Sequence, residues 1–334
     1  MKEILDTWFA IVNPAAGSGK TLAQWRTAES LLFQHGISYK FETPETKIGS
    51  IKLITKACSE GFRKFIAVGG DGTVHNTLSA IVEYVNKTRA ENPEEKISLS
   101  QFFLAVLPIG SGNDWLRSHN IPAQHTTIIN MISNGSFAPQ DIVKAEIIDP
   151  DTGKTAKRAY MANVGGYSFD ANVCDIVNFQ KTKGITGKML YVNALKKLAL
   201  IQKPFPTKVV CDGSEVYDDM VYSISFGNGR YSGGGLRQTP SAVIDDGLLD
   251  MMLVPKIPFW KVFFNIGKLL NGRAESVRFL HFHKAKQIEV TPHGQGQLVE
   301  IDGDVIGRAP LRLTVMDERI NVLDAQGAKD RARS

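Results

Sequence analysis

The chain has 334 residues, enough for two domains of ordinary size, and 43% of them are hydrophobic, as in globular proteins with sizeable cores. The 39 Lys and Arg residues against 34 Asp and Glu residues give a net charge of +5. This mild excess suits an anionic nucleotide or an anionic membrane surface, and it is too small to indicate nucleic-acid binding.

The cysteines and the N-terminal residues bear on the compartment in which the protein works. Cys58, Cys174 and Cys211 are isolated, which excludes a disulfide framework and a zinc site and indicates a reducing compartment. The first residues lack the pattern of a signal peptide, and no apolar run has the length of a membrane-spanning helix. We therefore expect a cytoplasmic protein.

Strands and helices alternate in the first part of the sequence. Four runs rich in apolar residues predict strands, namely Trp8–Val12, Ile37–Phe41, Phe65–Val68 and Phe102–Leu107. Segments with helical apolar stripes lie between them, whereas residues 86–100 are polar and predict an exposed loop. This alternation predicts an α/β domain with a parallel, doubly wound sheet.

A glycine-rich loop follows three of these strands. The loops are Asn13–Gly17, Gly69–Thr73 and Pro108–Asp114. Glycines let the backbone approach a ligand closely, and the amides at the start of a following helix suit a phosphate. Because ligands of such sheets bind at the carboxyl ends of the strands, we expect the three loops to form one phosphate-binding site.

Two of the loops depart from a plain phosphate-binding pattern. In the first loop, Pro14 occupies the position of the first glycine of a Walker loop, so the full Walker pattern is absent. In the second loop, Asp71 is an acid among phosphate-binding amides, which costs free energy unless a metal ion or a donor hydroxyl offsets its charge. As a bare pattern, residues 69–72 are also compatible with a hairpin-type turn.

After Asp141 the pattern changes to short strand-like runs separated by turn residues. Only two clear helices interrupt them, near residues 188–200 and 259–270. This pattern predicts a second domain built mainly of antiparallel sheet, a β-sandwich. We therefore expect one domain over residues 1–140 and another over residues 141–317, with a C-terminal segment near residues 318–330 that returns to the first domain.

Five motifs in order resemble the diacylglycerol kinase catalytic-domain superfamily. They are Asn13–Gly17, Gly69–Thr73, Pro108–Asp114, Asp245–Asp250 and Ile301–Asp304. The resemblance covers nearly the whole chain and is closest to the soluble bacterial lipid kinases, which are related to sphingosine and ceramide kinases. It implies an N-terminal nucleotide-binding domain similar to those of NAD kinases and phosphofructokinases, a C-terminal β-sandwich for the lipid substrate, and an active site between them.

The resemblance assigns the nucleotide to the three loops and implies ATP and Mg²⁺ as cofactors. The residues that it implies in ATP binding are Asn13, Pro14, Ala15, Ala16, Gly17, Thr43, Gly69, Gly70, Asp71, Gly72, Thr73, Ser111, Asn113 and Asp114. Asp71 would organise Mg²⁺ and the phosphates, and Ser111 matches a serine or threonine at the nucleotide. Thr43 is placed by a loose alignment in which Thr46 is the alternative.

The resemblance also implies a metal site in the C-terminal domain. A structural Mg²⁺ would be bound by the Asp246 side chain and by the main-chain carbonyls of Val243 and Leu248. Judged from the residues alone, Asp245 and Asp246 are more typical of a turn before Gly247.

Asp304 is the catalytic base that the resemblance implies, and Asp71 is the other catalytic residue. The family has Glu at the position of Asp304, so the carboxylate here is one methylene shorter, and small displacements of a reacting group change rates strongly. Asn76 likewise stands where the family has Glu. Judged from the residues alone, Asp302–Asp304 is typical of a hairpin turn.

These features predict an ATP- and Mg²⁺-dependent lipid kinase that transfers the γ-phosphoryl group to a lipid hydroxyl, converting diacylglycerol to phosphatidate. The alternatives are a sphingoid-base or ceramide kinase, a kinase for a soluble acceptor, and a catalytically weak nucleotide- or lipid-binding regulator. We expect a cytoplasmic enzyme that contacts the membrane surface transiently, with Lys196, Lys197 and Lys203 facing either anionic headgroups or solvent. No nucleic-acid partner is expected, and a homodimer through an edge strand is compatible with the sequence.

Overall fold

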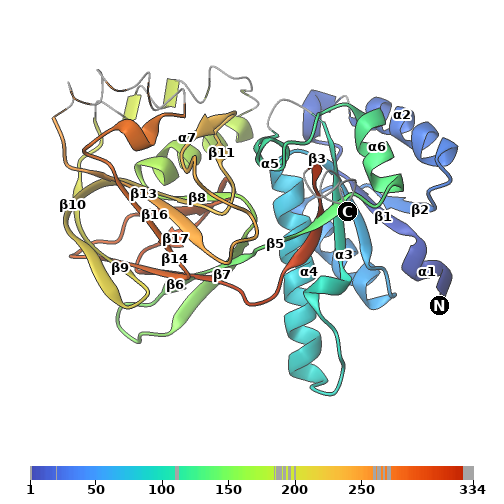
Figure 1. The fold of residues 1–334 in the computed structure, drawn as a ribbon, viewed down its shortest axis with the longest axis horizontal. Coiled ribbons are helices and arrows are strands. Elements are labelled where there is room, and N and C mark those ends of the chain that lie inside the picture. The colour runs from blue at the N-terminus through green and yellow to red at the C-terminus, as the bar shows by residue number, and fades with distance from the viewer. Residues whose placement is uncertain are drawn as a thin grey trace. The chain divides into compact units, whose positions relative to one another are not determined.

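The computed structural model divides the chain into two compact units (Figure 1). Unit 1 comprises Met1–Ile142 and Asp317–Ser334, and unit 2 comprises Val143–Met316. The structure describes residues 2–19, 21–109, 113–183, 201–258 and 272–325, with single positions between 185 and 198 and between 261 and 268. Among these residues, no helix combines the length and the apolar character that crossing a membrane requires.

The sheet of unit 1 is parallel except at one edge. Its strands are β1 (Trp8–Val12), β2 (Tyr39–Glu42), β3 (Lys64–Gly69), β4 (Phe103–Pro108), β5 (Phe137–Gln140) and β19 (Ile320–Leu323). Their order is β2-β1-β3-β4-β19-β5, and β5 is antiparallel to its neighbour β19. The strand β19 comes from the C-terminal end of the described chain and pairs in parallel with β4.

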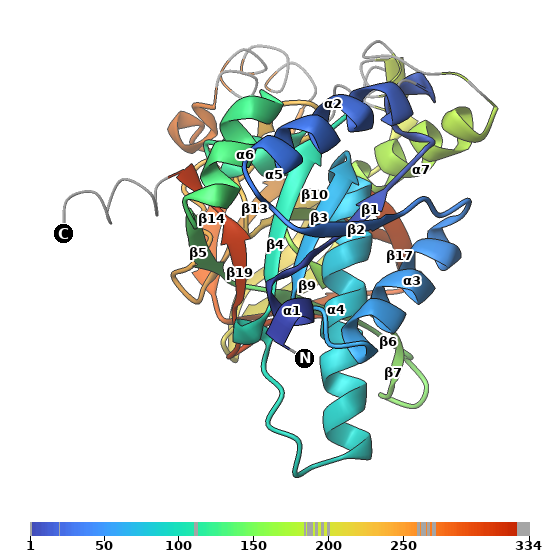
Figure 2. The ribbon, with the colours of Figure 1, turned by 90° about the vertical axis from the view of Figure 1, so that its right-hand side faces the viewer.

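Helices cover both faces of this sheet. They are α1 (Lys2–Asp6), α2 (Thr21–Gln34), α3 (Lys47–Ser59), α4 (Asp71–Glu91), α5 (Asp114–Ser118) and α6 (His125–Ser133), with short 3₁₀ helices η1 (Ala16–Gly19) and η2 (Leu99–Gln101). Figure 2 shows α2 and α6 together on one face and α3 with α4 on the other, as their mutual contacts require. Helix α4 continues to Glu91, so the loop predicted over residues 86–100 is shorter than expected; the helical backbone persists although that end is polar.

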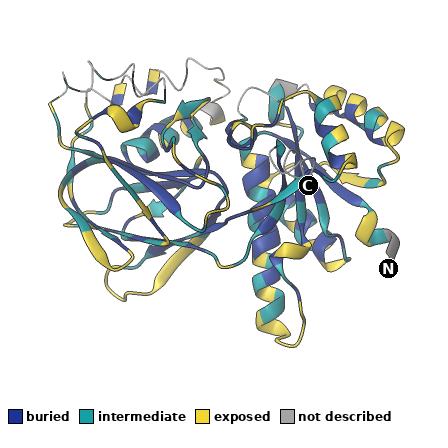
Figure 3. Cartoon of the chain, viewed as in Figure 1, coloured by how far each residue is buried: buried dark blue, intermediate teal, exposed yellow. Residues whose placement is uncertain are grey.

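The central strands of unit 1 are buried because helices cover both of their sides. All residues of β1 are buried, as are all residues of β3 after Lys64 (Figure 3). At the sheet edge, the Trp25 ring of α2 packs against the rings of Tyr39 and Phe41, at centroid distances of 5.9 and 5.4 Å. This core positions the carboxyl ends of β1, β3 and β4, from which the three glycine-rich loops leave.

Unit 2 is built on one 11-stranded antiparallel sheet, in the order β17-β16-β8-β10-β9-β15-β18-β6-β7 with β13 pairing both β10 and β14. The strands are β6 (Val143–Ile148), β7 (Thr155–Met161), β8 (Val164–Ser168), β9 (Phe205–Cys211), β10 (Ser214–Gly227), β13 (Leu249–Pro255), β14 (His281–Ala285), β15 (Gln287–Pro292), β16 (Leu298–Ile301), β17 (Asp304–Arg308) and β18 (Leu311–Val315). One buried cluster draws side chains from strands throughout this sheet, such as Val209, Leu249, Val299 and Leu313. The sheet therefore curls around a single core, as the two layers of a sandwich do.

Helix α7 (Phe169–Thr182) follows β8 directly and packs against β8, β10, β16 and β17. Its Val173 and Val177 belong to a small buried cluster with Leu190, Ala194 and Leu198. The unit also contains the short pair β11 (Tyr231–Ser232) and β12 (Leu236–Arg237) and the 3₁₀ helix η3 (Ala274–Ser276). The two helices predicted near residues 188–200 and 259–270 lie mostly outside the described residues.

Candidate active site

The sheet of unit 1 has a topological switch point between β1 and β3. The chain leaves β1 through α2 to reach β2 on one side, whereas it leaves β3 through α4 to reach β4 on the other side, and α2 and α4 lie on opposite faces (Figure 2). In open α/β sheets, ligands bind outside the carboxyl ends of the strands at such a point. The loops after β1 and β3 therefore lie where sheets of this kind bind their ligands.

The loop after β1 is connected to the loop after β3 by a side-chain hydrogen bond. The Asn13 Nδ2 atom donates to Thr73 Oγ1 at 3.2 Å, while Asn13 Oδ1 accepts from the Ala15 amide at 3.1 Å. Gly17 has φ 58°, a left-handed conformation that favours glycine. Further along, the Thr21 hydroxyl donates to the Ala16 carbonyl at 2.7 Å, which connects the loop to the first turn of α2.

The glycines of the second loop have different structural roles. A Cβ atom on Gly69 would lie 2.3 Å from Thr73 Oγ1, so a larger residue would displace the hydroxyl that accepts from Asn13. A Cβ atom on Gly72 would meet nothing within 4 Å. Gly72 lies in the first turn of the 21-residue helix α4, where the helix dipole favours an anion. The loop thus presents an open backbone surface at the positive end of a long helix.

Asp71 connects the second loop to the third. Its two carboxylate oxygens accept hydrogen bonds from the amides of Asp114 and Trp115, at 3.1 and 3.0 Å. These amides begin α5, so the acidic charge among the loop amides is offset in part by peptide groups and not only by a metal ion or a hydroxyl. A carboxylate has about four lone-pair sites, so these two bonds do not exhaust its capacity as a ligand. Its role toward Mg²⁺ stays a prediction.

Residues 110–112 of the third loop, Ser111 among them, lie outside the described residues. Asn113 precedes α5, and the buried Asp114 side chain forms an ion pair with Arg117 of the same helix. Beside this loop is a hollow of 390 Å³, lined by Gln24, Thr27, Pro108, Asn113, Ala123 and His125. The hollow thus lies at the carboxyl end of β4, next to the loops.

Thr43 and Thr46 were the two alternatives for a nucleotide contact after β2. The Thr46 hydroxyl accepts from the Gly49 amide at 3.0 Å and caps the amino end of α3. Thr43 is exposed and directly follows β2, at the same sheet edge as the three loops. The geometry therefore favours Thr43, while Thr46 has a structural role.

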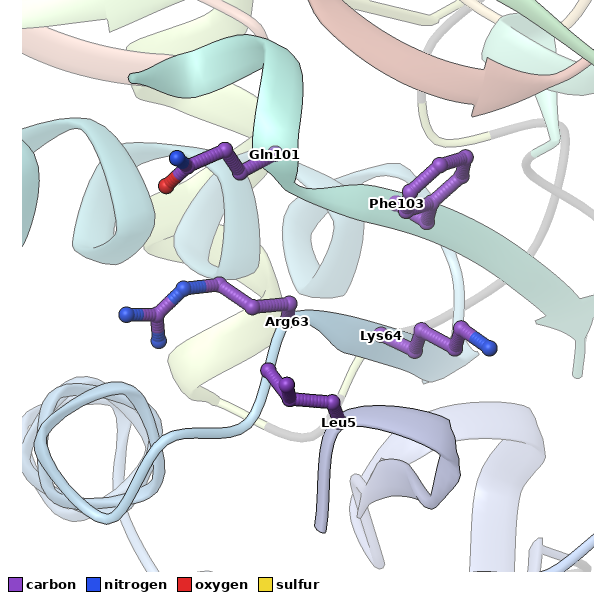
Figure 4. Close-up of a pocket in the computed structure, with 5 residues that line it drawn as sticks. All are labelled: Leu5, Arg63, Lys64, Gln101 and Phe103. Atoms are coloured by element: carbon purple, nitrogen blue, oxygen red, sulfur yellow. The ribbon is translucent and has the colours of Figure 1, made fainter. Parts of the chain in front are cut away.

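A second hollow, of 410 Å³, lies in unit 1 at the amino ends of the strands, opposite the glycine-rich loops. Its lining residues are Leu5, Arg63, Lys64, Gln101 and Phe103 (Figure 4). Lys64 and Phe103 are the first residues of β3 and β4, whereas the glycine-rich loops follow the last residues of these strands. Lys64 forms an ion pair with Asp6 at 3.0 Å, and Arg63 donates to the Cys58 and Phe62 carbonyls. This hollow has no part in the loop site.

In unit 2, Asp302 and Gly303 form the tight turn between β16 and β17. Both have left-handed backbone conformations, with φ 50° and 89°, as a two-residue hairpin of type I′ requires. The Asp302 carboxylate accepts from the amides of Ala162, Asn163 and Val164, at 2.7, 2.9 and 3.1 Å. Asp304 follows the turn, pairs with Ile301 and is half-buried.

The peptide groups of Gly303 are held by side chains from two other places. Its N–H donates to Glu300 Oε2 at 2.8 Å. Its carbonyl accepts from Asn178 Nδ2 at 2.8 Å and from the Cys174 thiol at 2.9 Å, both on α7. A plain hairpin needs none of these contacts, so the backbone beside Asp304 is held far more closely than the turn itself demands.

Two acids next to this turn, the buried Glu300 and the half-buried Asp170, have raised pKa values. Burial raises the pKa of Glu300 to about 8, the Gly303 N–H opposes this, and the charges of Asp170, Asp302 and Asp304 add to it. Burial also raises the pKa of Asp170 to about 6, against hydrogen bonds that include those from Ser225 at 2.6 Å and Gln238 at 3.1 Å. Asp170 and Glu300 were not among the predicted site residues, because no local sequence pattern shows that packing will remove an acid from water.

The predicted metal site lies at the turn before β13. Asp246 Oδ1 accepts from the Leu248 amide at 3.0 Å, while the Lys284 ammonium lies 3.6 Å from Asp246 Oδ2 and 3.1 Å from Asp250 Oδ2. The two carboxylates outweigh the one ammonium, and oxygen donors suit a hard cation such as Mg²⁺. Among the described residues, no three His, Cys, Asp or Glu side chains gather as a metal site, so any Mg²⁺ here depends on main-chain carbonyls, such as those of Val243 and Leu248.

Two family models match the chain, one over most of unit 1 and one over most of unit 2 together with strand β19. The model of the diacylglycerol kinase catalytic domain matches residues 7–145, and that of the YegS C-terminal NAD kinase beta sandwich-like domain matches residues 164–324. The chain belongs to the diacylglycerol kinase catalytic-domain superfamily. The resemblance of the five motifs is thus confirmed, and the predicted fold class, a parallel α/β domain followed by a mainly antiparallel β-sandwich domain, is confirmed as well.

Relatives in this superfamily are named as lipid kinases. A probable lipid kinase YegS-like from Xanthomonas oryzae pv. oryzae is 25% identical over 266 residues, which are 79% of this chain and 78% of the relative. A diacylglycerol kinase from Mycobacterium tuberculosis is 24% identical over 315 residues, 94% of each chain. The superfamily is a kinase family, which implies ATP as the phosphoryl donor.

Solved structures share the fold. A putative diacylglycerol kinase from Bacillus anthracis has a TM-score of 0.74 at 21% identity, with 96% of both chains covered. Yeast NADH kinase in complex with NADH has a TM-score of 0.54 at 8% identity, covering 98% of this chain and 87% of that chain. The α/β domain and the β-sandwich therefore occur together in other kinases.

Proposed function

We propose that this member of the superfamily is an ATP- and Mg²⁺-dependent diacylglycerol kinase, which transfers the γ-phosphoryl group to the free hydroxyl of diacylglycerol and releases phosphatidate and ADP. The relative named as a diacylglycerol kinase, which matches 94% of this chain, supports diacylglycerol over sphingoid bases and ceramides. The domain over residues 141–317 would take the lipid, and the domain over residues 1–140, with the segment near 318–330, would take the nucleotide.

The loop network of unit 1 carries the nucleotide part of the proposal. The bonds from Asn13 to Thr73 and from the amides of Asp114 and Trp115 to Asp71 join three loops at the switch point of a doubly wound sheet. These bonds hold the loop backbones in place, so that the remaining loop amides would bind phosphates at a lower ordering cost. Mg²⁺, when bound, would neutralise phosphate charge next to Asp71, and Thr43 and Asn113 complete the proposed contacts.

The Asp302–Gly303 turn of unit 2 supports the part of the proposal that concerns the lipid hydroxyl. Asp304 would take the proton from the lipid hydroxyl while the hydroxyl oxygen forms its bond to the γ-phosphorus. The bond between that phosphorus and the bridging oxygen of ADP breaks in the same step, and ADP leaves with the electron pair. A base contributes only when its carboxylate is held in place, and the side chains that contact Gly303 supply this rigidity.

Exposed apolar and basic residues on unit 2 support a transient contact with the membrane surface. Phe179 on α7 is 59% exposed, and Ile185 and Ile201 beyond it are 50% and 61% exposed. Lys197 and Lys203 are exposed in the same part of the chain, while Lys196 lies outside the described residues. Apolar side chains with nearby lysines suit insertion at an anionic lipid surface.

Gly72→Ala tests the nucleotide site with little disturbance of the fold. Its Cβ atom would meet no protein atom within 4 Å, so we expect the melting temperature to stay that of the wild type. If phosphates approach this backbone, the methyl group should obstruct them and weaken Mg·ATP binding at least about tenfold in titration calorimetry. A tenfold change corresponds to a loss of about 1.4 kcal/mol of binding free energy. Unchanged affinity would contradict the assignment of this loop.

The substrate is tested by incubating the protein with a total lipid extract and labelled ATP and identifying the labelled product. Labelled phosphatidate is the expected result. A labelled sphingoid base or ceramide would mean that this lipid, and not diacylglycerol, is the substrate. A labelled water-soluble acceptor would mean that the substrate is not a lipid. Tight ATP binding without turnover on any acceptor would identify a regulator, which is the alternative raised by Asp304 and Asn76.

A further inference from the structure

Glu300 lies on a face of β16 where an acid is unexpected. Its neighbours Val299 and Ile301 point into the core of unit 2, so the alternation of the strand directs Glu300 to the other side, toward α7. It is only 8% exposed there. Its Oε2 atom accepts from the Gly303 amide, one residue before Asp304.

The acidic groups around Glu300 come from α7 and from the turn. Asp170 in the first turn of α7 shares a side of Gly166 with it, since a Cβ atom on Gly166 would lie 2.6 Å from Asp170 Cβ and 3.1 Å from Glu300 Oε1. Asp302 and Asp304 act on it from the turn and the start of β17. The three charged groups that act on Glu300 are thus all acids, the Cys174 thiol of α7 bonds the Gly303 carbonyl, and strand β8 faces Glu300 with Gly166.

A charged Glu300 would therefore place a buried fourth negative charge beside three partly buried carboxylates. Burial is the main cause that raises its pKa, to about 8, and at neutral pH it carries a proton. The unfolded chain releases this proton near pH 4.5, so between pH 4.5 and 8 the residue progressively lowers the stability of the fold, and its full cost is present above pH 8. Glutamine has the same shape and an acceptor for Gly303 without this cost.

We infer that Glu300 is a positioning residue for Asp304: it holds the Gly303 peptide, and the turn keeps the arrangement in which Asp304 acts as the base while Glu300 is protonated. Loss of the proton strengthens the bond from the Gly303 N–H, but it also places a buried charge against Asp302 and Asp304, and this repulsion moves the turn away from the arrangement in which Asp304 can take a proton from the acceptor. Small displacements of a reacting group are costly to the rate. The turnover rate therefore falls under alkaline conditions, and ATP affinity does not. This inference rests on the proposed role of Asp304.

The pH profile of turnover tests the inference. For the wild type, kcat on the confirmed lipid substrate should fall about tenfold between pH 7 and pH 9, as the protonated fraction does for a group with a pKa of about 8. In Glu300→Gln the fall of kcat between pH 7 and pH 9 should be absent. The KM for ATP should depend on pH in the same way in this variant and in the wild type. Glu289→Gln is the matched control, because Glu289 lies on β15 in an ion pair with Arg312, and it should keep the wild-type profile. An alkaline fall that persists in Glu300→Gln would overturn the inference.

Hydrogen exchange tests the effect of Glu300 protonation on the Gly303 turn without requiring kinase activity. Above pH 8, after correction for intrinsic exchange, the wild-type segment around Gly303 should lose protection, and the same segment in Glu300→Gln should not. Equal protection in both proteins would overturn the inference, whatever the substrate. If exchange behaves as expected while Asp304→Asn keeps full activity, then the positioning of the turn holds and the assignment of Asp304 as the base falls. Glu300→Asp, which is too short to reach the Gly303 amide, should lose protection at every pH.

Discussion

Unit 2 contains two Asp–Gly hairpin turns that are nearly identical in local structure and differ in their surroundings. Asp212 and Gly213 join β9 to β10 with φ 47° and 79°, and Asp302 and Gly303 join β16 to β17 with φ 50° and 89°. In both turns the aspartate carboxylate accepts hydrogen bonds from backbone amides at or just before the start of another strand. Asp212 accepts from the amides of Lys286 and Gln287, at 3.2 and 2.8 Å. Asp302 accepts from the amides of residues 162–164.

The residues two positions before and one position after each turn distinguish them. Val210 precedes the first turn and Ser214 follows it, whereas the second turn has the buried Glu300 before it and Asp304 after it. The first turn is exposed, and only the second receives side chains of α7 at its glycine. A hairpin turn therefore needs only the local Asp–Gly pair, and the additional acids and the α7 contacts point to chemistry at Asp304.

The largest expected difference between the turns is in turnover. Asp304→Asn should lower kcat by about 10²–10⁴-fold, the typical contribution of a positioned base, with ATP affinity unchanged by calorimetry. Ser214→Ala, at the matching position of the other turn, should leave kcat unchanged. Asp304→Glu then reports on the local geometry: increased activity would mean that the backbone suits the longer acid of the family, and decreased activity that it has adapted to aspartate. Full activity of Asp304→Asn would disprove its role as the base.

A smaller difference is expected in stability. Asp302→Ala removes the acceptor of three amides at the start of β8, and unpaired buried donors cost about 1–3 kcal/mol each, so the free energy of unfolding should fall by about 3 kcal/mol or more. Asp212→Ala removes the acceptor of two amides in an exposed turn, where water replaces the carboxylate, and it should cost about 1 kcal/mol. Urea unfolding of both variants measures this. Equal losses would mean that burial around Asp302 has no energetic consequence.

The smallest expected effect concerns a third Asp–Gly pair, Asp246 and Gly247. Gly247 has φ 76°, and the proposed Mg²⁺ would share Asp246 with the Lys284 ammonium. An ion that binds only the folded protein stabilises it by about 1.4 kcal/mol at a tenfold excess over its dissociation constant. Added Mg²⁺ should therefore raise the melting temperature of the wild type but not that of Asp246→Ala, and Lys284→Met should increase the effect. A wild type insensitive to both Mg²⁺ and chelators would leave Asp246 as a turn residue.

The fold class and the loop positions follow from the sequence by itself. The apolar runs of β1, β3 and β4 have the length of buried strands, and helical patterns between them leave a parallel sheet as the arrangement that buries all of them. In such a sheet the carboxyl ends of the strands share one edge, so Asn13 and Thr73 could be expected near each other although 60 positions separate them. Local pattern and chain connectivity are sufficient for this inference.

Only the tertiary structure determines which acids are buried and from which amides their carboxylates accept hydrogen bonds. Asp212 and Asp302 precede glycine in the same way, and nothing within either motif distinguishes an exposed turn from one beside α7. The partners of Asp302 lie 138 to 140 positions away, and Asp71 accepts from amides 43 and 44 positions away. The protonation of Glu300 likewise depends on α7 and the neighbouring acids. Burial and long-range pairing are properties of the packed chain, so no local sequence pattern contains them.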